Sequence, residues 1–105
     1  MSDKIKVVVQ HPGKLSRVVT IPNKLQSMQE LVGGNIEVHP LGVLLIGMNE
    51  EGRIKELPEN VRFVQYGTST IVGPVFITAA EGEEFRSLTT KEIQAARAWL
   101  LRYSV

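Results

Sequence analysis

Short apolar runs, each closed by a glycine or a proline, limit what this chain can fold into. Ile5–Val9 is rich in β-branched residues, as expected of a buried strand. Pro12-Gly13 suits the centre of a type II turn, in which glycine supplies the positive φ. Leu15–Ile21 then returns as a second strand, and Pro22 closes it. The pattern predicts an N-terminal β-hairpin, and no apolar run reaches the roughly 18 residues of a membrane-spanning helix.

A short helix is expected after this hairpin. Apolar residues recur there at the spacing of one helix face, at Leu25, Met28, Leu31 and Val32. Asn23 is a suitable N-cap, and Gln26 is placed to reach back as in a capping box. Gly33-Gly34 follows the helix, whereas phosphate-binding glycine loops precede one, where free N–H groups point outward. The glycine pair is therefore expected to end the helix.

The segment Asn35–Leu41 alternates between apolar and polar residues, which predicts a strand with one wet face. Glu37 and His39 lie two residues apart and share that face. Together with His11 they raise the alternatives of a metal site or of acid–base chemistry. The sequence contains no characteristic spacing of metal ligands, so no metal-binding residues are predicted.

The middle of the chain predicts further strands joined by polar turns. Val43–Met48 has the composition of a buried strand, Asn49–Gly52 is turn-like, and Arg53–Leu57 is expected to pair back as a strand. Val61–Tyr66 fits either a short strand or a helical turn. Thr70–Ala79 reads as a strand, although its internal glycine–proline pair argues for an edge position or a bulge.

The C-terminal segment carries the clearest helix signal. Thr89 and Glu92 have the spacing of a capping box. One apolar stripe follows, formed by Ile93, Ala96, Leu100 and Tyr103 and widened by Trp99. The whole sequence, residues 1–105, therefore predicts a single α+β domain. It would have a largely antiparallel sheet and two helices, one short and following the N-terminal hairpin, the other C-terminal.

The absence of cysteine excludes some classes of function, and the near-neutral charge disfavours others. The chain has 12 basic and 11 acidic residues, a net charge of +1, whereas a protein that binds DNA through phosphate contacts normally has a larger basic excess. It has no cysteine, so disulfides and thiol catalysis are excluded. No signal peptide is recognised at the N-terminus, and a cytoplasmic location is expected. No cofactor is predicted.

No arrangement of nucleophile, histidine and acid is recognisable, so a non-enzymatic protein is expected. Hydroxyl, amide, aromatic and guanidinium groups are instead concentrated between Asn49 and Thr70. Such groups can provide directional hydrogen bonds and a stacking surface in a ligand pocket. The predicted ligand-binding residues are Asn49, Arg53, Asn60, Tyr66, Thr68 and Thr70.

Four blocks of the sequence together resemble a known family. They are MQELVGGNIEVHPL, NEEGRIKELPEN, IVGPVFI and GEEFRSLTTKEIQ, in this order. From Ile5 to about Leu100 the chain is similar to a small domain family of unknown function. That family is found in short proteins of bacteriophages, plasmids and conjugative elements, mostly of Firmicutes and related bacteria. Its members commonly have an aromatic residue where this chain has Asn35, and a second proline where it has Glu59.

The resemblance brings no catalytic residues, but it implies a genomic context. The leading hypothesis is a non-enzymatic accessory protein of a phage or mobile element in the cytoplasm of a bacterial host. It would be a homo-oligomer that binds a small, nucleotide-derived ligand and so sequesters a host-defence signal. The alternative is a protein-interaction module that inhibits or adapts a host protein, using an edge near Gly73-Pro74 or the Trp99 helix. A DNA-binding regulator is a less favoured third reading.

Overall fold

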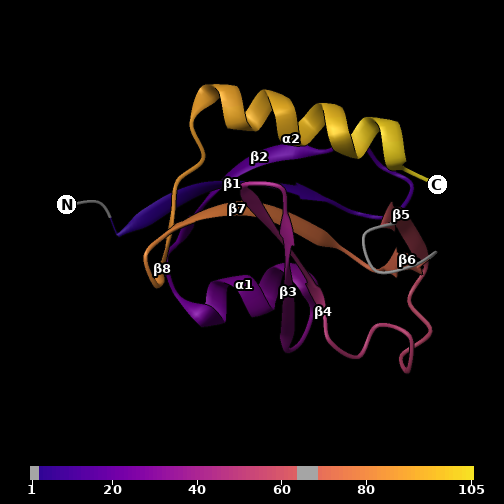
Figure 1. Ribbon diagram of the computed structural model, residues 1–105. Helices are drawn as coiled ribbons and strands as arrows, with labels where there is room; N and C mark the ends of the chain where they lie inside the picture. The colour runs from indigo at the N-terminus through magenta and orange to yellow at the C-terminus, as the bar shows by residue number, and fades with distance from the viewer. Residues whose placement is uncertain (1–2, 64–68) are drawn as a thin grey trace.

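A central antiparallel sheet lies between two helices (Figure 1). The computed structural model describes residues 3–63 and 69–105. The helices are α1 (Leu25–Val32) and α2 (Thr90–Tyr103). The strands are β1 (Lys4–Gln10), β2 (Arg17–Pro22), β3 (Ile36–Leu41), β4 (Leu44–Asn49), β5 (Glu59–Phe63), β6 (Ser69–Val72), β7 (Val75–Glu81) and β8 (Glu84–Arg86). This is the expected α+β domain, with a short helix after an N-terminal hairpin and a second helix at the C-terminus.

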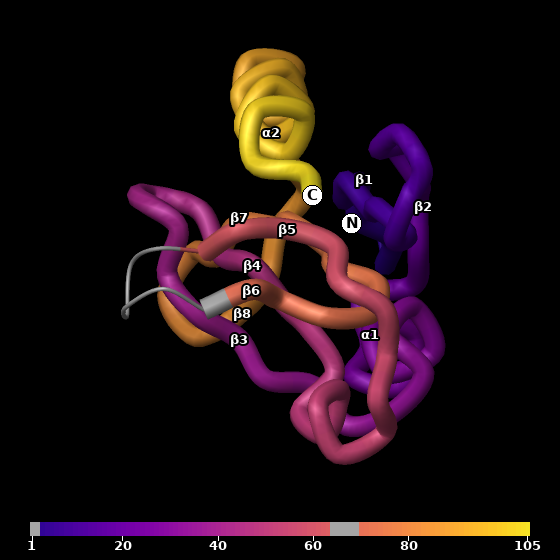
Figure 2. The backbone as a smooth tube through the Cα atoms, turned by 90° about the vertical axis from the view of Figure 1, so that its right-hand side faces the viewer, coloured from indigo at the N-terminus to yellow at the C-terminus, as the bar shows by residue number. Residues whose placement is uncertain are grey.

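The main sheet has the strand order β2-β1-β7-β4-β3, and the short strand β8 pairs with β7. Its pairings are all antiparallel. Strands β5 and β6 form a separate two-stranded sheet that lies near the C-terminal end of α2 (Figure 1). In the view of Figure 2, β2 lies at one outer side of the molecule and β3 at the other. The two edges of the main sheet are thus far apart.

Side-chain alternation along the strands divides the core between the two faces of the sheet. One cluster lies between the sheet, α2 and the β5–β6 hairpin; it includes Val8, Ile46, Ile77, Val61, Phe63, Ile71, Ala96 and Leu100. The other lies between the sheet and α1; it includes Val7, Val9, Ile21, Met28, Val32 and Phe76. Helix α2 packs its predicted apolar stripe against the sheet, with Ala96 and Leu100 buried. In α1, Met28 and Val32 are buried and Leu31 packs against their cluster, whereas Leu25, which was predicted on the same stripe, is 59% exposed. The result is a three-layer domain with the sheet in the middle.

Helix α1 ends as expected but begins differently. Gly33 adopts a left-handed conformation with φ of +79°, and its N–H bonds to the carbonyl of Gln29 at 2.8 Å. The predicted N-cap was wrong, because Lys24 occupies that position and makes no side-chain cap. The Asn23 amide instead donates to the carbonyl of Phe85 at 3.0 Å. Asn23 thus bonds to a residue 62 positions away in the sequence and not to the first turn of the helix.

The segment after β4 was also predicted incorrectly. Residues 50–56 form a series of turns, closed by bonds from Lys55 N–H to the Glu51 carbonyl and from Leu57 N–H to the Gly52 carbonyl. The expected strand over Arg53–Leu57 is absent from these described residues. The predicted Thr70–Ala79 strand is two strands, β6 and β7, which separate at Gly73, where φ is +79°. Residues 61–63 belong to strand β5, which settles the described part of the ambiguous segment.

The C-terminal helix begins where the sequence predicts. The Thr89 hydroxyl accepts from the Glu92 N–H at 3.2 Å, and the Glu92 carboxylate accepts from the Thr89 N–H at 2.9 Å. Arg86 holds the same carboxylate through two bonds, of 2.8 and 2.9 Å. These bonds hold the pKa of Glu92 at about 2, with the Arg86 bond as the largest cause and the Thr89 backbone bond as the second.

A buried polar network joins the two sheets and the C-terminal end of α2. Asn60 is 1% exposed, and its side-chain amide donates to the carbonyls of Gln10 and Gly73 at 2.9 Å each. The side-chain oxygen of Asn60 accepts a bond from the side-chain amide of Gln10 at 3.0 Å. The same Gln10 amide also donates to the Ser104 hydroxyl at 2.9 Å. Because Asn60 belongs to β5 and Gln10 to β1, the network fixes the small sheet against the large one.

Within residues 3–63 and 69–105, neither helix has the length and apolar character needed to cross a membrane.

Candidate ligand pocket

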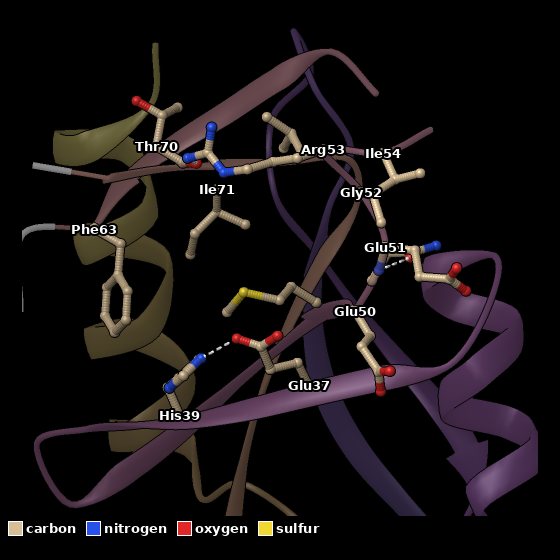
Figure 3. Close-up of a pocket in the computed structure, with 13 residues that line it drawn as sticks. Glu37, His39, Glu50, Glu51, Gly52, Arg53, Ile54, Phe63, Thr70 and Ile71 are labelled. Atoms are coloured by element: carbon tan, nitrogen blue, oxygen red, sulfur yellow. Dashed lines mark hydrogen bonds and ion pairs between the residues drawn. The ribbon is translucent and has the colours of Figure 1, made fainter. Parts of the chain in front are cut away.

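A pocket of about 290 Å³ opens between β3, the β5–β6 hairpin and the turns that follow β4 (Figure 3). Three separate parts of the chain therefore build its walls. The residues that line it are Glu37, His39, Met48, Asn49, Glu50, Glu51, Gly52, Arg53, Ile54, Phe63, Thr70, Ile71 and Val72.

The interior of the pocket is apolar. Met48, Phe63 and Ile71 come from β4, β5 and β6, and each is less than one-tenth exposed. In Figure 3 the Phe63 ring lies along one side, and the Ile71 side chain points inward from above. An apolar surface with a few polar groups at its border is the usual form of a small-molecule site.

Glu37 and His39 form one polar wall. The Glu37 carboxylate and the His39 Nε2 are hydrogen-bonded at 2.5 Å, as strand alternation on a shared face allows (Figure 3). The predicted common face of these two residues is therefore confirmed. The His39 ring lies 6.1 Å from the Phe63 ring, centroid to centroid, with an interplanar angle of 49°. This wall presents a carboxylate and an imidazole beside an aromatic ring.

Arg53 lies across the opposite border. Its Nη2 donates to the carbonyl of Thr70 at 2.7 Å, which ties the turn after β4 to strand β6 (Figure 3). Gly52 brings the two segments together, because a Cβ at this position would lie only 2.8 Å from the Cγ2 of Val72. The absence of a side chain at Gly52 thus allows the close approach that places Arg53 at the pocket.

The charges that line the pocket are unequal. Glu37, Glu50 and Glu51 are acidic residues of the lining, and Arg53 is basic. In Figure 3 the Glu37 carboxylate lies at the pocket, whereas the Glu50 and Glu51 carboxylates point away from its interior. Carboxylates accept hydrogen bonds and repel phosphate, and a guanidinium can bind one phosphate or carbonyl group. The lining therefore favours a ligand whose inner part is neutral or donates hydrogen bonds, with any anionic group close to Arg53.

Of the six residues predicted to bind a ligand, Asn49, Arg53 and Thr70 line this pocket. The Asn49 amide is engaged elsewhere, since it donates to the Val32 carbonyl at 3.0 Å and its oxygen accepts from the Glu51 N–H at 2.8 Å. Asn49 therefore shapes the turn. Thr70 contributes its main-chain carbonyl to the bond with Arg53.

Asn60 does not line this pocket; it lies in the buried network with Gln10. Tyr66 and Thr68 lie outside the described residues. Among the pocket residues that sequence reasoning did not assign to a ligand site are the apolar Met48, Phe63 and Ile71. Their only sequence signal was the apolar pattern of strands, which is the same for any core residue.

A metal centre is not indicated by the arrangement. Among residues 3–63 and 69–105, no group of three or more His, Asp or Glu side chains is placed to hold a metal ion. His11, the third residue of the metal alternative, does not line the pocket that contains Glu37 and His39.

Comparison with known proteins places the chain in a family. No curated protein and no solved structure matches it. A family model described as "Domain of unknown function (DUF3846)" matches residues 5–101, which is most of the chain. The resemblance seen in the sequence is thereby confirmed at the level of a domain of unknown function, and the chain belongs to the DUF3846 family.

Proposed function

We propose that this protein is a non-enzymatic binding protein whose pocket beside β3 holds a small ligand. The observation that carries the proposal is the convergence of three kinds of group on one 290 Å³ space. Phe63 offers an aromatic surface, Glu37 a hydrogen-bond acceptor, and Arg53 a charged donor. Each comes from a different part of the chain.

The proposed ligand class is a nucleobase with a small polar substituent. A planar ring can pack against the apolar side chains of Met48, Phe63 and Ile71 and donate an amino group to the Glu37 carboxylate. The volume is at the lower end of the range for ligand sites, so it suits one ring system better than a dinucleotide. A phosphate would have to lie near Arg53, since the remaining charges of the lining are negative.

The biological role that we propose rests on the family resemblance. A phage or mobile-element protein of this kind would act in the cytoplasm of the bacterial host and sequester a nucleotide-derived defence signal. For the alternative role, binding a host protein, the sequence suggested two contact surfaces, an edge near Gly73-Pro74 and the helix that contains Trp99. In the structure, Gly73 is buried, and Trp99 packs against Phe63 and Tyr103 with ring centroids at 6.1 and 5.1 Å. Neither residue offers a large exposed surface, which supports the pocket as the functional site, although the Trp99 helix exposes another apolar side chain, that of Leu101, at 68%.

Calorimetric titration tests the proposal, with nucleosides, nucleoside monophosphates and cyclic nucleotides as probes. We expect at least one nucleoside or mononucleotide to bind. We expect Arg53→Ala to weaken the binding of monophosphates more than that of nucleosides, and Glu37→Gln to weaken the binding of both. Arg102→Ala is the matched control, because Arg102 is exposed on α2 and contacts the Tyr103 ring at 5.6 Å, away from the pocket. No heat of binding with any probe at millimolar concentration would contradict the proposal.

One observation favours a second function, an enzyme that uses the Glu37–His39 pair. A hydrogen-bonded carboxylate and imidazole beside a pocket can act in general acid–base catalysis. Mass spectrometry of a bound probe after prolonged incubation distinguishes the two. The binding proposal expects unchanged probe with the natural protein. Conversion that is lost in His39→Gln would establish the enzyme instead.

A further inference from the structure

Strand β2 forms one edge of the main sheet. The hydrogen bonds of the neighbouring strand β1 show which main-chain groups of β2 face away from the sheet. The Lys6 N–H donates to the Ser87 hydroxyl and its carbonyl accepts from the Leu88 N–H, so both groups point away from β2. Lys6 is directly opposite Thr20 in the ladder. In an antiparallel pair the bonded positions alternate, so Thr20 and Val18 direct their N–H and C=O groups away from β1.

The outward-facing row is closed at both ends. Before β2, the Ser16 carbonyl accepts from the Arg97 guanidinium at 3.3 Å. At the other end, Pro22 has no N–H, and its carbonyl accepts from the Lys24 N–H at 2.9 Å. What remains is a window of two N–H and two C=O groups, on Val18 and Thr20. No other described strand pairs with this side of β2.

Apart from the exposed Arg17 at its first position, this edge lacks the usual protection against pairing. Natural edge strands are commonly blocked by an internal proline, a bulge or an inward-pointing charge. The opposite edge, β3, carries Pro40 within the strand. In β2 the only proline is the last residue, the register with β1 is unbroken from Arg17 to Pro22, and Val18 is 40% exposed.

We propose that β2 is the dimer interface of this protein, with β2 of a second copy paired antiparallel to it. A two-fold axis at Val19 places Val18 of one copy opposite Thr20 of the other, so that all four groups of each window are satisfied. Shifting the axis by one residue would pair Thr20 with the occupied Ser16 position, or Val18 with Pro22, which has no N–H. Only the register centred on Val19 uses the whole window.

The side chains fit the same register. The two Arg17 side chains lie at opposite ends of the paired strands, about 13 Å apart along the strand direction, which avoids repulsion between them. Each Arg17 is opposite Ile21 of the partner copy, and the two Val19 side chains are adjacent on the α1 face. The interface is at the other edge of the sheet from the pocket, so the inference is independent of the proposed function.

Sedimentation velocity over a concentration series up to about 100 µM tests the association, because this range populates a dimer of micromolar dissociation constant. We expect a dimer for the natural chain and for Thr20→Val, and a monomer for Thr20→Pro. Proline removes an outward N–H that the β1–β2 ladder does not use, so the fold should be retained and circular dichroism should be unchanged. A monomer at every concentration, or a Thr20→Pro dimer of unchanged affinity, would overturn the proposal.

Single cysteines test the register without relying on the proline variant. The chain has no cysteine of its own. In Val19→Cys the two thiols face each other across a non-hydrogen-bonded pair with Cα atoms about 4.5 Å apart, within the range of a disulfide. We expect Val19→Cys to form a covalent dimer on mild oxidation and Arg17→Cys, its matched control, to remain monomeric on a denaturing gel. Cross-linking of Arg17→Cys but not of Val19→Cys would exclude this register.

Discussion

The side-chain amide of Asn60 donates a 2.9 Å hydrogen bond to the main-chain carbonyl of Gln10, 50 residues earlier in the chain. This bond joins the small β5–β6 sheet to the first strand of the main sheet. The Val105 N–H also bonds to the Asn60 carbonyl, at 3.0 Å, so the C-terminus is held at the same point. We therefore assign Asn60 a structural role and do not include it among the residues proposed to contact a ligand.

Asn60→Ala should destabilise the protein by about 3 kcal/mol, since the carbonyls of Gln10 and Gly73 lose their bonds from the Asn60 amide and the Gln10 amide keeps only its bond to the Ser104 hydroxyl. The midpoint of urea denaturation measures the loss. The control is Asn35→Ala, which removes a single exposed bond from the Gln29 amide and should cost well under about 1 kcal/mol. At temperatures where the variant stays folded, its affinity for a pocket ligand should be unchanged. A stable Asn60→Ala variant with weakened binding would instead support the original sequence prediction.

Gly47→Ala should cost about 2 kcal/mol, because added volume in a packed core is not easily accommodated. A Cβ at Gly47 would overlap the ring of Phe76, which is fully buried on the neighbouring strand β7. Thermal denaturation measures the effect. The double variant Gly47→Ala/Phe76→Leu should lose less stability than the two single changes added together. Additive losses would show that the ring and the glycine do not share this space.

Acid should weaken the start of helix α2 through Glu92. Its pKa is lowered to about 2 in the folded protein, whereas the ordinary value is 4.5. The unfolded chain therefore binds a proton at higher pH than the folded chain does. The stabilisation by the ionised carboxylate is present above pH 4.5 and is lost as the pH falls toward 2.

Glu92→Gln should consequently reduce the fall in melting temperature between pH 5 and pH 2. Glu83→Gln is the matched control, since Glu83 is exposed in the turn between β7 and β8 and should leave the pH profile unchanged. Identical profiles for the natural protein and Glu92→Gln would contradict a role for this carboxylate.

Thr89→Ala removes the other half of the capping box and should cost about 1 kcal/mol at neutral pH.

Gly52→Ala should weaken ligand binding more than it weakens the fold. The added methyl group would press against Val72 and move the Arg53 turn away from β6, with loss of the bond to the Thr70 carbonyl. Calorimetric titration with the best-binding probe measures the change. Val72→Ala in the same chain frees the space and should restore part of the affinity. An affinity unaffected by Gly52→Ala would argue that the turn does not position Arg53 for the ligand.

Sequence alone determined those features whose partners lie within a few residues. The Thr89–Glu92 capping box placed the start of α2, and Gly33 placed the end of α1, because both depend on bonds that close within one turn of helix. Alternation along β3 correctly put Glu37 and His39 on one face. These local signals were enough for the α+β class and the order of most elements.

Tertiary structure decided everything that depends on distant partners. Asn23 is a residue type that commonly caps helices, yet its amide donates to the carbonyl of Phe85. Asn60 was predicted to bind a ligand, yet its amide is buried and donates to the carbonyl of Gln10. An amide side chain forms bonds equally well with local or remote groups, so its sequence position cannot tell which it will find. The pocket likewise requires Phe63, Ile71 and Met48 to meet across three strands. Their apolar character predicts burial, but only the packing of the β5–β6 hairpin beside β3 makes that surface a site.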